Sequence, residues 1–111
     1  MSHSINGNNI TLTRGDTLFL QLNLTKDGSE FTPESGDSIR FAVKQKYKDA
    51  DEDVLINKAV PIDTLLLEIE PDDTKPLTMG KDYVYDIEYT DAAGHVDTFI
   101  KGTLHIDEEV I

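Results

Sequence analysis

The amino-acid sequence predicts an all-β domain, an immunoglobulin-like antiparallel β-sandwich of about seven strands. Three observations favour this fold class: apolar and polar residues alternate in short runs, turn-forming residues separate the runs, and no long amphipathic helix is visible. Such alternation gives a strand one apolar and one polar face, which is typical of antiparallel sheets. The chain of 111 residues is expected to form a single domain, 1–111, in which residues 1–7 are a flexible N-terminal segment.

The first two strands are expected at residues 8–13 and 16–25. In the second run, four leucines at alternate positions share one face, and the opposite face carries Phe19, Gln21 and Asn23. The alternation therefore places the leucines in the core and the other three side chains outside it.

Alternation continues through the rest of the chain. Apolar residues at 39, 41 and 43 share a face in one run, and three tyrosines share a face with Ile87 in a later one. The remaining strands are expected near residues 38–46, 54–60, 64–70, 82–90 and 95–106.

One short helical turn is expected near residues 71–76. Pro71 suits the first position of a helix because its φ is already fixed at a helical value. Asp72 and Asp73 would place favourable negative charge on that first turn. Pro76 then ends it.

Two glycines mark irregular backbone in the C-terminal part. Gly94 can take a positive φ, so the segment DAAGHV, residues 91–96, is predicted to be a short hairpin loop. Gly102 interrupts the pattern of the last strand, which predicts a bulge or bend near Lys101.

The charge balance restricts the classes of partner. The chain carries 22 acidic and 10 basic residues, which gives a formal net charge of −12. Nucleic-acid phosphates and anionic membrane surfaces would repel such a protein, so neither is an expected partner. A positively charged partner is compatible with this surface, and the acidity also favours solubility.

The absence of cysteine excludes disulfide bonds, a thiolate nucleophile and cysteine-ligated zinc. No cofactor is expected, because the sequence shows no glycine-rich phosphate loop. No signal peptide is visible, and the longest aliphatic run, Leu65-Leu66-Leu67, is far too short to span a membrane. The chain is expected to stay in the cytoplasm or to leave it by lysis.

The tripeptide Arg14-Gly15-Asp16 matches the signal that animal adhesion proteins offer to integrins. Predicted strands flank it directly, whereas a displayed motif needs the tip of an exposed loop. Gly15 supplies backbone freedom, and Asp16 can accept a hydrogen bond from a following amide. We therefore predict a structural turn and treat adhesion as the alternative.

An acidic segment, KDADEDV, is the only candidate cation site. Its four carboxylates lie within five residues and are Asp49, Asp51, Glu52 and Asp53. Alternate carboxylates resemble the start of a calcium-binding loop. Val54 stands where that loop needs glycine, and Val60 stands where it needs a bidentate glutamate. A solvated acidic loop is the default interpretation, and a weak cation site is the alternative.

Histidine and tyrosine offer the remaining candidates for chemistry. His95 lies two residues before Asp97 on one strand face, a pair that could support base chemistry but is more often an ordinary pair of neighbours. Tyr83, Tyr85 and Tyr89 are expected to fill the interior with their hydroxyls at its rim. A sugar-binding platform is the alternative for this row.

The interface candidates are Phe19, Gln21 and Asn23, which face away from the leucine row. An outward phenylalanine is often covered by a neighbouring segment, here residues 1–7. It can equally be an anchor for another subunit. Both interpretations stay open at the level of sequence.

Three segments carry a resemblance to a known module: ITLTRGDTLFLQLNL, then DSIRFAVKQK, then LLLEIEPDDTKPLTMGKDYVYDIEYTDAAGHVDTFIKGTLHI. Their order resembles a β-sandwich module of tailed-phage particles, similar to the N-terminal domain of baseplate upper proteins and related tail-associated domains. The resemblance covers about residues 8–107. It implies that Gly15, Asp16, Asp86 and Gly102 are framework positions.

The resemblance implies a non-enzymatic structural protein of a phage or prophage particle, associated with the tail or baseplate. It would act by docking to other phage particle proteins or to itself. It would be made in the host bacterial cytoplasm and then join the virion. The alternative is a free-standing carbohydrate- or cell-surface-binding module, which would need an exposed aromatic platform.

Overall fold

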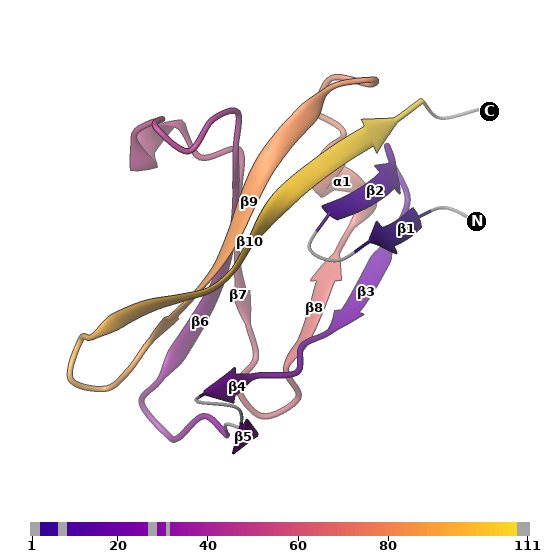
Figure 1. Cartoon of the computed structure of the whole chain (residues 1–111). Coiled ribbons are helices and arrows are strands. Elements are labelled where there is room, and N and C mark those ends of the chain that lie inside the picture. The colour runs from indigo at the N-terminus through magenta and orange to yellow at the C-terminus, as the bar shows by residue number, and fades with distance from the viewer. Residues whose placement is uncertain (1–2, 7–8, 27–28, 31, 109–111) are drawn as a thin grey trace.

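The computed structural model describes residues 3–6, 9–26, 29–30 and 32–108, which are mainly β-strand (Figure 1). The all-β prediction is confirmed. The strands are β1 His3–Asn6, β2 Asn9–Thr13, β3 Leu18–Gln21, β4 Thr25–Lys26, β5 Ser29–Glu30, β6 Ser38–Lys44, β7 Ile56–Val60, β8 Leu66–Ile69, β9 Asp82–Thr90 and β10 Val96–Asp107. A 3-10 turn covers Asp51–Asp53, and a single helical turn, α1, covers Pro71–Thr74.

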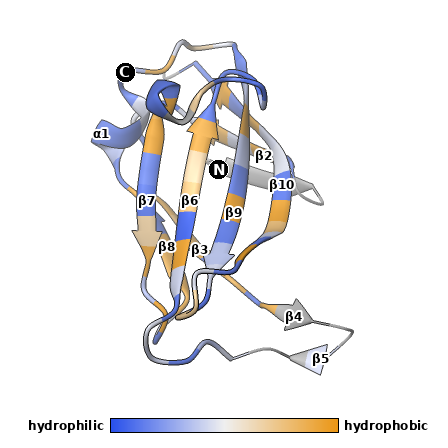
Figure 2. Cartoon of the chain, turned by 90° about the vertical axis from the view of Figure 1, so that its left-hand side faces the viewer, coloured by the Kyte–Doolittle hydropathy of each residue, from blue (hydrophilic) through white to orange (hydrophobic). Residues whose placement is uncertain are grey.

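The strands form one large sheet and two small ones. The large sheet has six strands in the order β1-β2-β10-β9-β6-β7, and β3 pairs with β8 in a separate two-stranded sheet. Figure 1 shows the large sheet curling past the β3–β8 pair, and Figure 2 shows the alternation of polar and apolar residues as bands along β6, β7 and β9. The short pair β4–β5 forms a third sheet. The six-stranded sheet is therefore much larger than either of the other two.

The pairing of β2 with β10 corrects the expectation of a wholly antiparallel fold. These two strands run parallel, with Ile10 beside Leu104 and Leu12 beside Ile106. Parallel neighbours cannot be joined by a tight turn and need a long connection. Here almost the whole chain lies between them, so the parallel arrangement is geometrically possible.

The core lies between the concave face of the large sheet and the β3–β8 pair. Alternate residues of β9 are buried, namely its three tyrosines and Ile87. Aromatic and β-branched side chains of this kind suit a half-buried pleated strand. The rings of Phe41 and Tyr85 meet with centroids 5.6 Å apart. The largest fully buried apolar side chains are Phe41, Ile10, Leu12, Leu18, Leu67, Ile69, Ile87, Leu104, Ile106 and Val43.

The N-terminal segment contributes a strand that lies outside the predicted strand ranges. His3–Asn6 form β1, which pairs antiparallel with β2. Residues 1, 2 and 7 lie outside the described residues. The edge of β2 offers backbone N–H and C=O groups that form hydrogen bonds with any neighbouring strand, because these bonds do not involve side chains. A polar segment can therefore pair there.

The irregularity in β10 lies earlier than Gly102 predicts. The register against β9 shifts between Thr98 and Ile100, whereas Gly102 lies within the strand, opposite Tyr85. Phe99 and Ile100 are consecutive and both pack against the core. A regular strand cannot send two consecutive side chains to one face, so the bulge falls there.

Candidate functional site

The Arg-Gly-Asp tripeptide forms the turn between β2 and β3 and holds α1 in place. Gly15 has a φ of +85°, and its N–H donates to Thr74 Oγ1 at 2.8 Å. The Arg14 guanidinium donates to the carbonyl of Lys75, with Nε at 3.1 Å. The Asp16 N–H donates to the carbonyl of the last residue of β2 at 3.1 Å. The first two residues of the tripeptide thus bind the protein's own backbone and side chains.

The acidic segment does not gather ligands among the described side chains. Asp49 Oδ2 accepts from the N–H of Lys46 at 3.2 Å, so this carboxylate closes a local turn. Glu52 and Asp53 are exposed, and the side chain of Asp51 lies outside the described ones. Within the described part of the chain, no group of three or more histidines and carboxylates is arranged to hold a metal ion.

The tyrosine row of β9 lies in the core, as predicted. Tyr83, Tyr85 and Tyr89 are 3%, 4% and 6% exposed. The hydroxyl oxygen of Tyr83 accepts from the N–H of Thr78 at 2.8 Å, which places this hydroxyl at the rim of the core. Tyr47 is instead half exposed, and its hydroxyl donates to the carbonyl of Gly102 at 2.9 Å. Because the row is buried, it cannot form a sugar-binding platform.

Phe19 lies on an exposed face together with a residue that the sequence analysis did not single out. Phe19 is 58% exposed and Leu66 is 37% exposed. Phe19 lies opposite Glu68, and Gln21 lies opposite Leu66, so all four share the outer face of the β3–β8 pair. We call these four residues the Phe19 patch. Leu66 follows from the same alternation that marked Phe19, because its neighbours on β8 are buried.

Gln21 has a structural contact inside this patch. Its side-chain amide donates to the carbonyl of Thr64 at 2.9 Å and to that of Leu65 at 3.2 Å. Leu65 has a φ of +56°, a conformation that is strained for a side chain other than glycine. Gln21 therefore supports the turn that leads into β8. Asn23 is exposed but lies beyond the end of β3.

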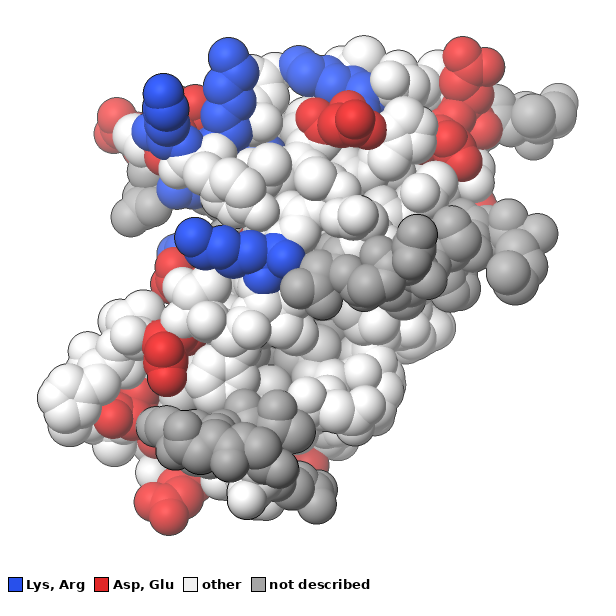
Figure 3. Space-filling model, viewed as in Figure 1, with Lys and Arg blue, Asp and Glu red and all other residues white. Residues whose placement is uncertain are grey.

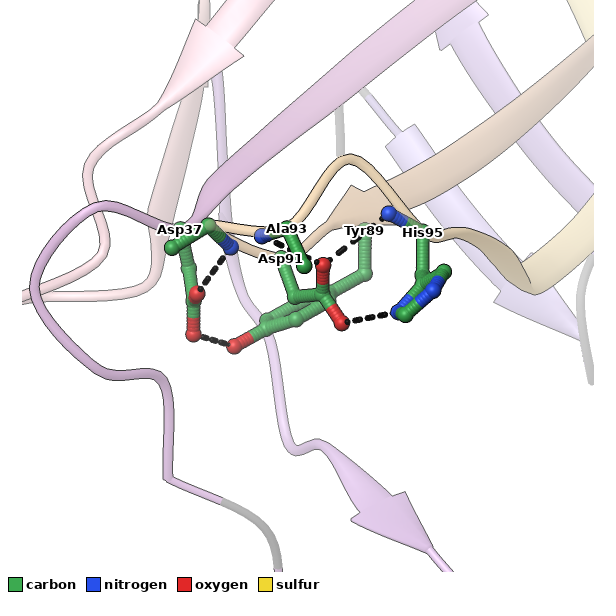
Figure 4. Close-up of polar contacts among 6 residues, drawn as sticks. Asp37, Tyr89, Asp91, Ala93 and His95 are labelled. Atoms are coloured by element: carbon green, nitrogen blue, oxygen red, sulfur yellow. Dashed lines mark hydrogen bonds and ion pairs between the residues drawn. The ribbon is translucent and has the colours of Figure 1, made fainter.

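A polar cluster joins the segment before β6 to the β9–β10 hairpin (Figure 4). The hydroxyl of Tyr89 donates to the carboxylate of Asp37, which also accepts from the N–H groups of Glu34 at 2.8 Å and Ala92 at 3.1 Å. Burial, together with this hydrogen bond, raises the pKa of Tyr89 to about 12. The hydroxyl in turn holds the pKa of Asp37 below its usual value.

The hairpin itself is organised by Asp91. Its carboxylate accepts from the N–H groups of Ala93 and His95, both at 2.9 Å, and Oδ2 lies 3.0 Å from His95 Nδ1. Gly94 in this loop has a φ of +89°. His95 therefore pairs with Asp91 rather than with Asp97. The hydrogen bond from the backbone N–H of His95 is the main reason why the pKa of Asp91 is lowered.

No protein-family model matches this chain, and no curated protein matches it significantly. In the described residues, no helix is long and apolar enough to cross a membrane. The Phe19 patch places two exposed apolar side chains, Phe19 and Leu66, on a fixed pair of strands.

Proposed function

We propose that this protein is a non-enzymatic docking component of a phage or prophage particle, associated with the tail or baseplate. The observation that carries the proposal is the exposure of Phe19, at 58%, on the same face of the β3–β8 pair as Leu66, at 37%. Exposed aromatic side chains with an apolar neighbour are typical anchors of protein–protein interfaces. The order of the three sequence segments quoted above supports the choice of a phage particle.

The backbone beneath the patch favours docking because it holds Phe19 at a fixed position. β3 and β8 pair over four residues each, and Leu18 and Leu67 on their inner face are 1% exposed. A preordered anchor loses little conformational entropy when a partner covers it. The packing of this pair against the large sheet also supports the immunoglobulin-like sandwich as part of the proposal.

The two histidines with described side chains are each paired with carboxylates at the surface. His95 pairs with Asp91, and His105 lies between Asp82 and Asp107, with Nε2 3.1 Å from Asp107 Oδ1. Among the described residues, neither His95 nor His105 has a hydrogen bond to a serine or threonine hydroxyl that could act as a nucleophile. We expect these pairs to stabilise local structure.

The direct test is to induce the strain that encodes the chain, purify particles and search them for this protein by mass spectrometry. We expect it at a constant ratio to other particle proteins. The double variant Phe19→Ala, Leu66→Ala should fold but enter particles several-fold less often. Leu55→Ala, which truncates a leucine that is 45% exposed outside the patch, is the matched control and should be incorporated normally. Absence from particles, or normal incorporation of the double variant, would contradict the proposal.

The carbohydrate-binding alternative depends on Tyr47, since the other three tyrosines are buried. Lys101 Nζ lies 5.3 Å from the centre of the Tyr47 ring, and such a cation–aromatic pair resembles the edge of a polar binding surface. A glycan array tests it: binding that Tyr47→Ala abolishes would favour this alternative, and the absence of binding would dismiss it.

A further inference from the structure

Strand β10 has one edge that is only partly used. It pairs with β9 from Val96 to His105, but with β2 only from Leu104 to Asp107. Among the strands described, none pairs with that second edge between Val96 and Lys101. Val96, Asp97 and Thr98 are also exposed. An unpaired edge presents backbone N–H and C=O groups to which another strand can be added.

Val96, Asp97 and Phe99, in this part of β10, help to line an open pocket of about 520 Å³. Its floor includes the rings of Tyr89 and Phe99, which stack with centroids 5.5 Å apart. Its walls come from two segments far apart in the sequence, the stretch before β6 and the β9–β10 hairpin. A strand added to β10 would therefore run past the pocket.

The pocket is strongly acidic. Four carboxylates line it, those of Glu34, Asp37, Asp91 and Asp97, and no lysine or arginine is among its described lining residues. On the face viewed in Figure 3, no lysine or arginine is visible among the described side chains of the lower half, where the β9–β10 hairpin of Figure 1 lies.

The four carboxylates divide into two kinds. Asp37 and Asp91 accept hydrogen bonds from the protein itself, and these bonds lower the pKa of both groups, so both stay ionised at neutral pH. The side chains of Glu34 and Asp97 make no hydrogen bond or ion pair within the described structure. They lie on the two segments that form the walls, and they are free to bind a cationic group between them.

We propose that the free edge of β10 and this acidic pocket together bind an extended segment of a partner protein, with lysine or arginine at alternate positions. The backbone of that segment pairs with Val96–Lys101. Because side chains alternate along a strand, every second residue faces the pocket, and its charge complements Glu34 and Asp97. The surface is separate from the Phe19 patch, so this inference does not depend on the proposed function.

The charge of the chain disfavours a second copy of it as the occupant. Each copy carries a formal net charge of −12 and would bring its own Asp97 to the same edge. Charge then selects a basic segment over an acidic one.

The test is an NMR titration of the full, 15N-labelled chain with the capped peptide KVKVKVK. We expect saturable shifts and slower amide exchange confined to Val96–Lys101 and the pocket, with a Kd on the order of 100 μM. The peptide EVEVEVE should not bind. A KVKVKVK peptide with N-methyl groups on alternate residues keeps its charge but cannot pair along one edge, and it should bind at least about tenfold more weakly.

Matched variants test the pocket. The double variant Glu34→Gln, Asp97→Asn should weaken binding of KVKVKVK about tenfold. Glu52→Gln, Asp53→Asn removes the same charge from exposed positions outside the pocket and should change the affinity less than about twofold. All four positions are exposed, so the fold should survive, which unchanged spectra of the free variants will verify.

Four results of the peptide titrations overturn the inference. They are no saturable shift up to about 1 mM peptide, shifts that map to another surface, equal binding of the N-methylated peptide, and equal loss in the two double variants. Concentration-dependent shifts of Val96–Lys101 without any peptide would instead identify a second copy as the occupant, and would also overturn it.

Discussion

Strands β9 and β10 run side by side, yet their surroundings differ. β9 buries every second residue from Tyr83 to Tyr89, whereas β10 buries only Leu104 and Ile106. β9 lies between β6 and β10 along its length, while β10 has a second neighbour only at its C-terminal end. The comparison shows that alternation in sequence identifies a strand, but that the neighbouring strands decide how much of it is core.

The largest difference in the free energy of unfolding is expected when one side chain on each strand is truncated. Ile87→Ala on β9 removes a side chain that is 1% exposed and should lower the free energy of unfolding by about 2–5 kcal/mol. Val96→Ala on β10 removes one that is 62% exposed and should change it by less than about 0.5 kcal/mol. Urea denaturation measures both. Similar losses in the two variants would show that the hairpin end of β10 is packed as tightly as β9.

A smaller difference is expected for hydrogen bonds. Tyr83→Phe on β9 removes the acceptor of the Thr78 N–H, at 2.8 Å, and should lower the free energy of unfolding by about 1 kcal/mol. Thr103→Val on β10 removes an exposed hydrogen bond to Asn9 Oδ1, at 2.9 Å, and should lower it by less than about 0.5 kcal/mol. Thermal unfolding of the two variants gives the comparison. A greater loss for Thr103→Val would reverse the ranking of the strands.

A third difference depends on pH and concerns the last buried position of β9, where Tyr89 lies opposite exposed Asp97. The folded-state pKa of Tyr89, about 12, lies above its usual value of 10.0, so the native state holds this proton more tightly than the unfolded chain. The resulting stability is complete below pH about 10 and is lost as the pH rises towards about 12.

Tyr89→Phe isolates this effect from those of the other tyrosines. The stability advantage of the unchanged protein over the variant should be constant from neutral pH to pH about 10 and shrink above it. Urea denaturation at several pH values measures the difference. An advantage that stays constant up to pH about 12 would contradict the role of the Asp37 hydrogen bond and of burial.

The strands with strong alternation could be predicted from the sequence closely. The predicted range 82–90 coincides with β9, and 54–60 and 64–70 contain β7 and β8. β1 could not be predicted, because its residues, HSIN, show no apolar row and pair only because the edge of β2 is available. The consecutive apolar residues Phe99 and Ile100 indicate the position of the bulge in the sequence, whereas Gly102 indicated a position too late in the strand.

The candidate site was predicted only in part, because most of it depends on contacts between distant residues. Phe19 and Gln21 followed from local alternation, and Leu66 joins them only through the pairing of β3 with β8. The contact of Asp37 with Tyr89 joins residues 52 positions apart. No local pattern in the sequence encodes such a pair, since it depends on where the chain returns after folding.

The parallel pairing of β2 with β10 has a consequence for how the molecule is made. Asn9 and Thr103, 94 positions apart, are joined by a side-chain hydrogen bond beside that pairing. During translation, β2 leaves the ribosome long before its partner exists, and it has to wait, exposed to chaperones and proteases, until β10 has also emerged. Closure of the large sheet is thus a late event in biosynthesis.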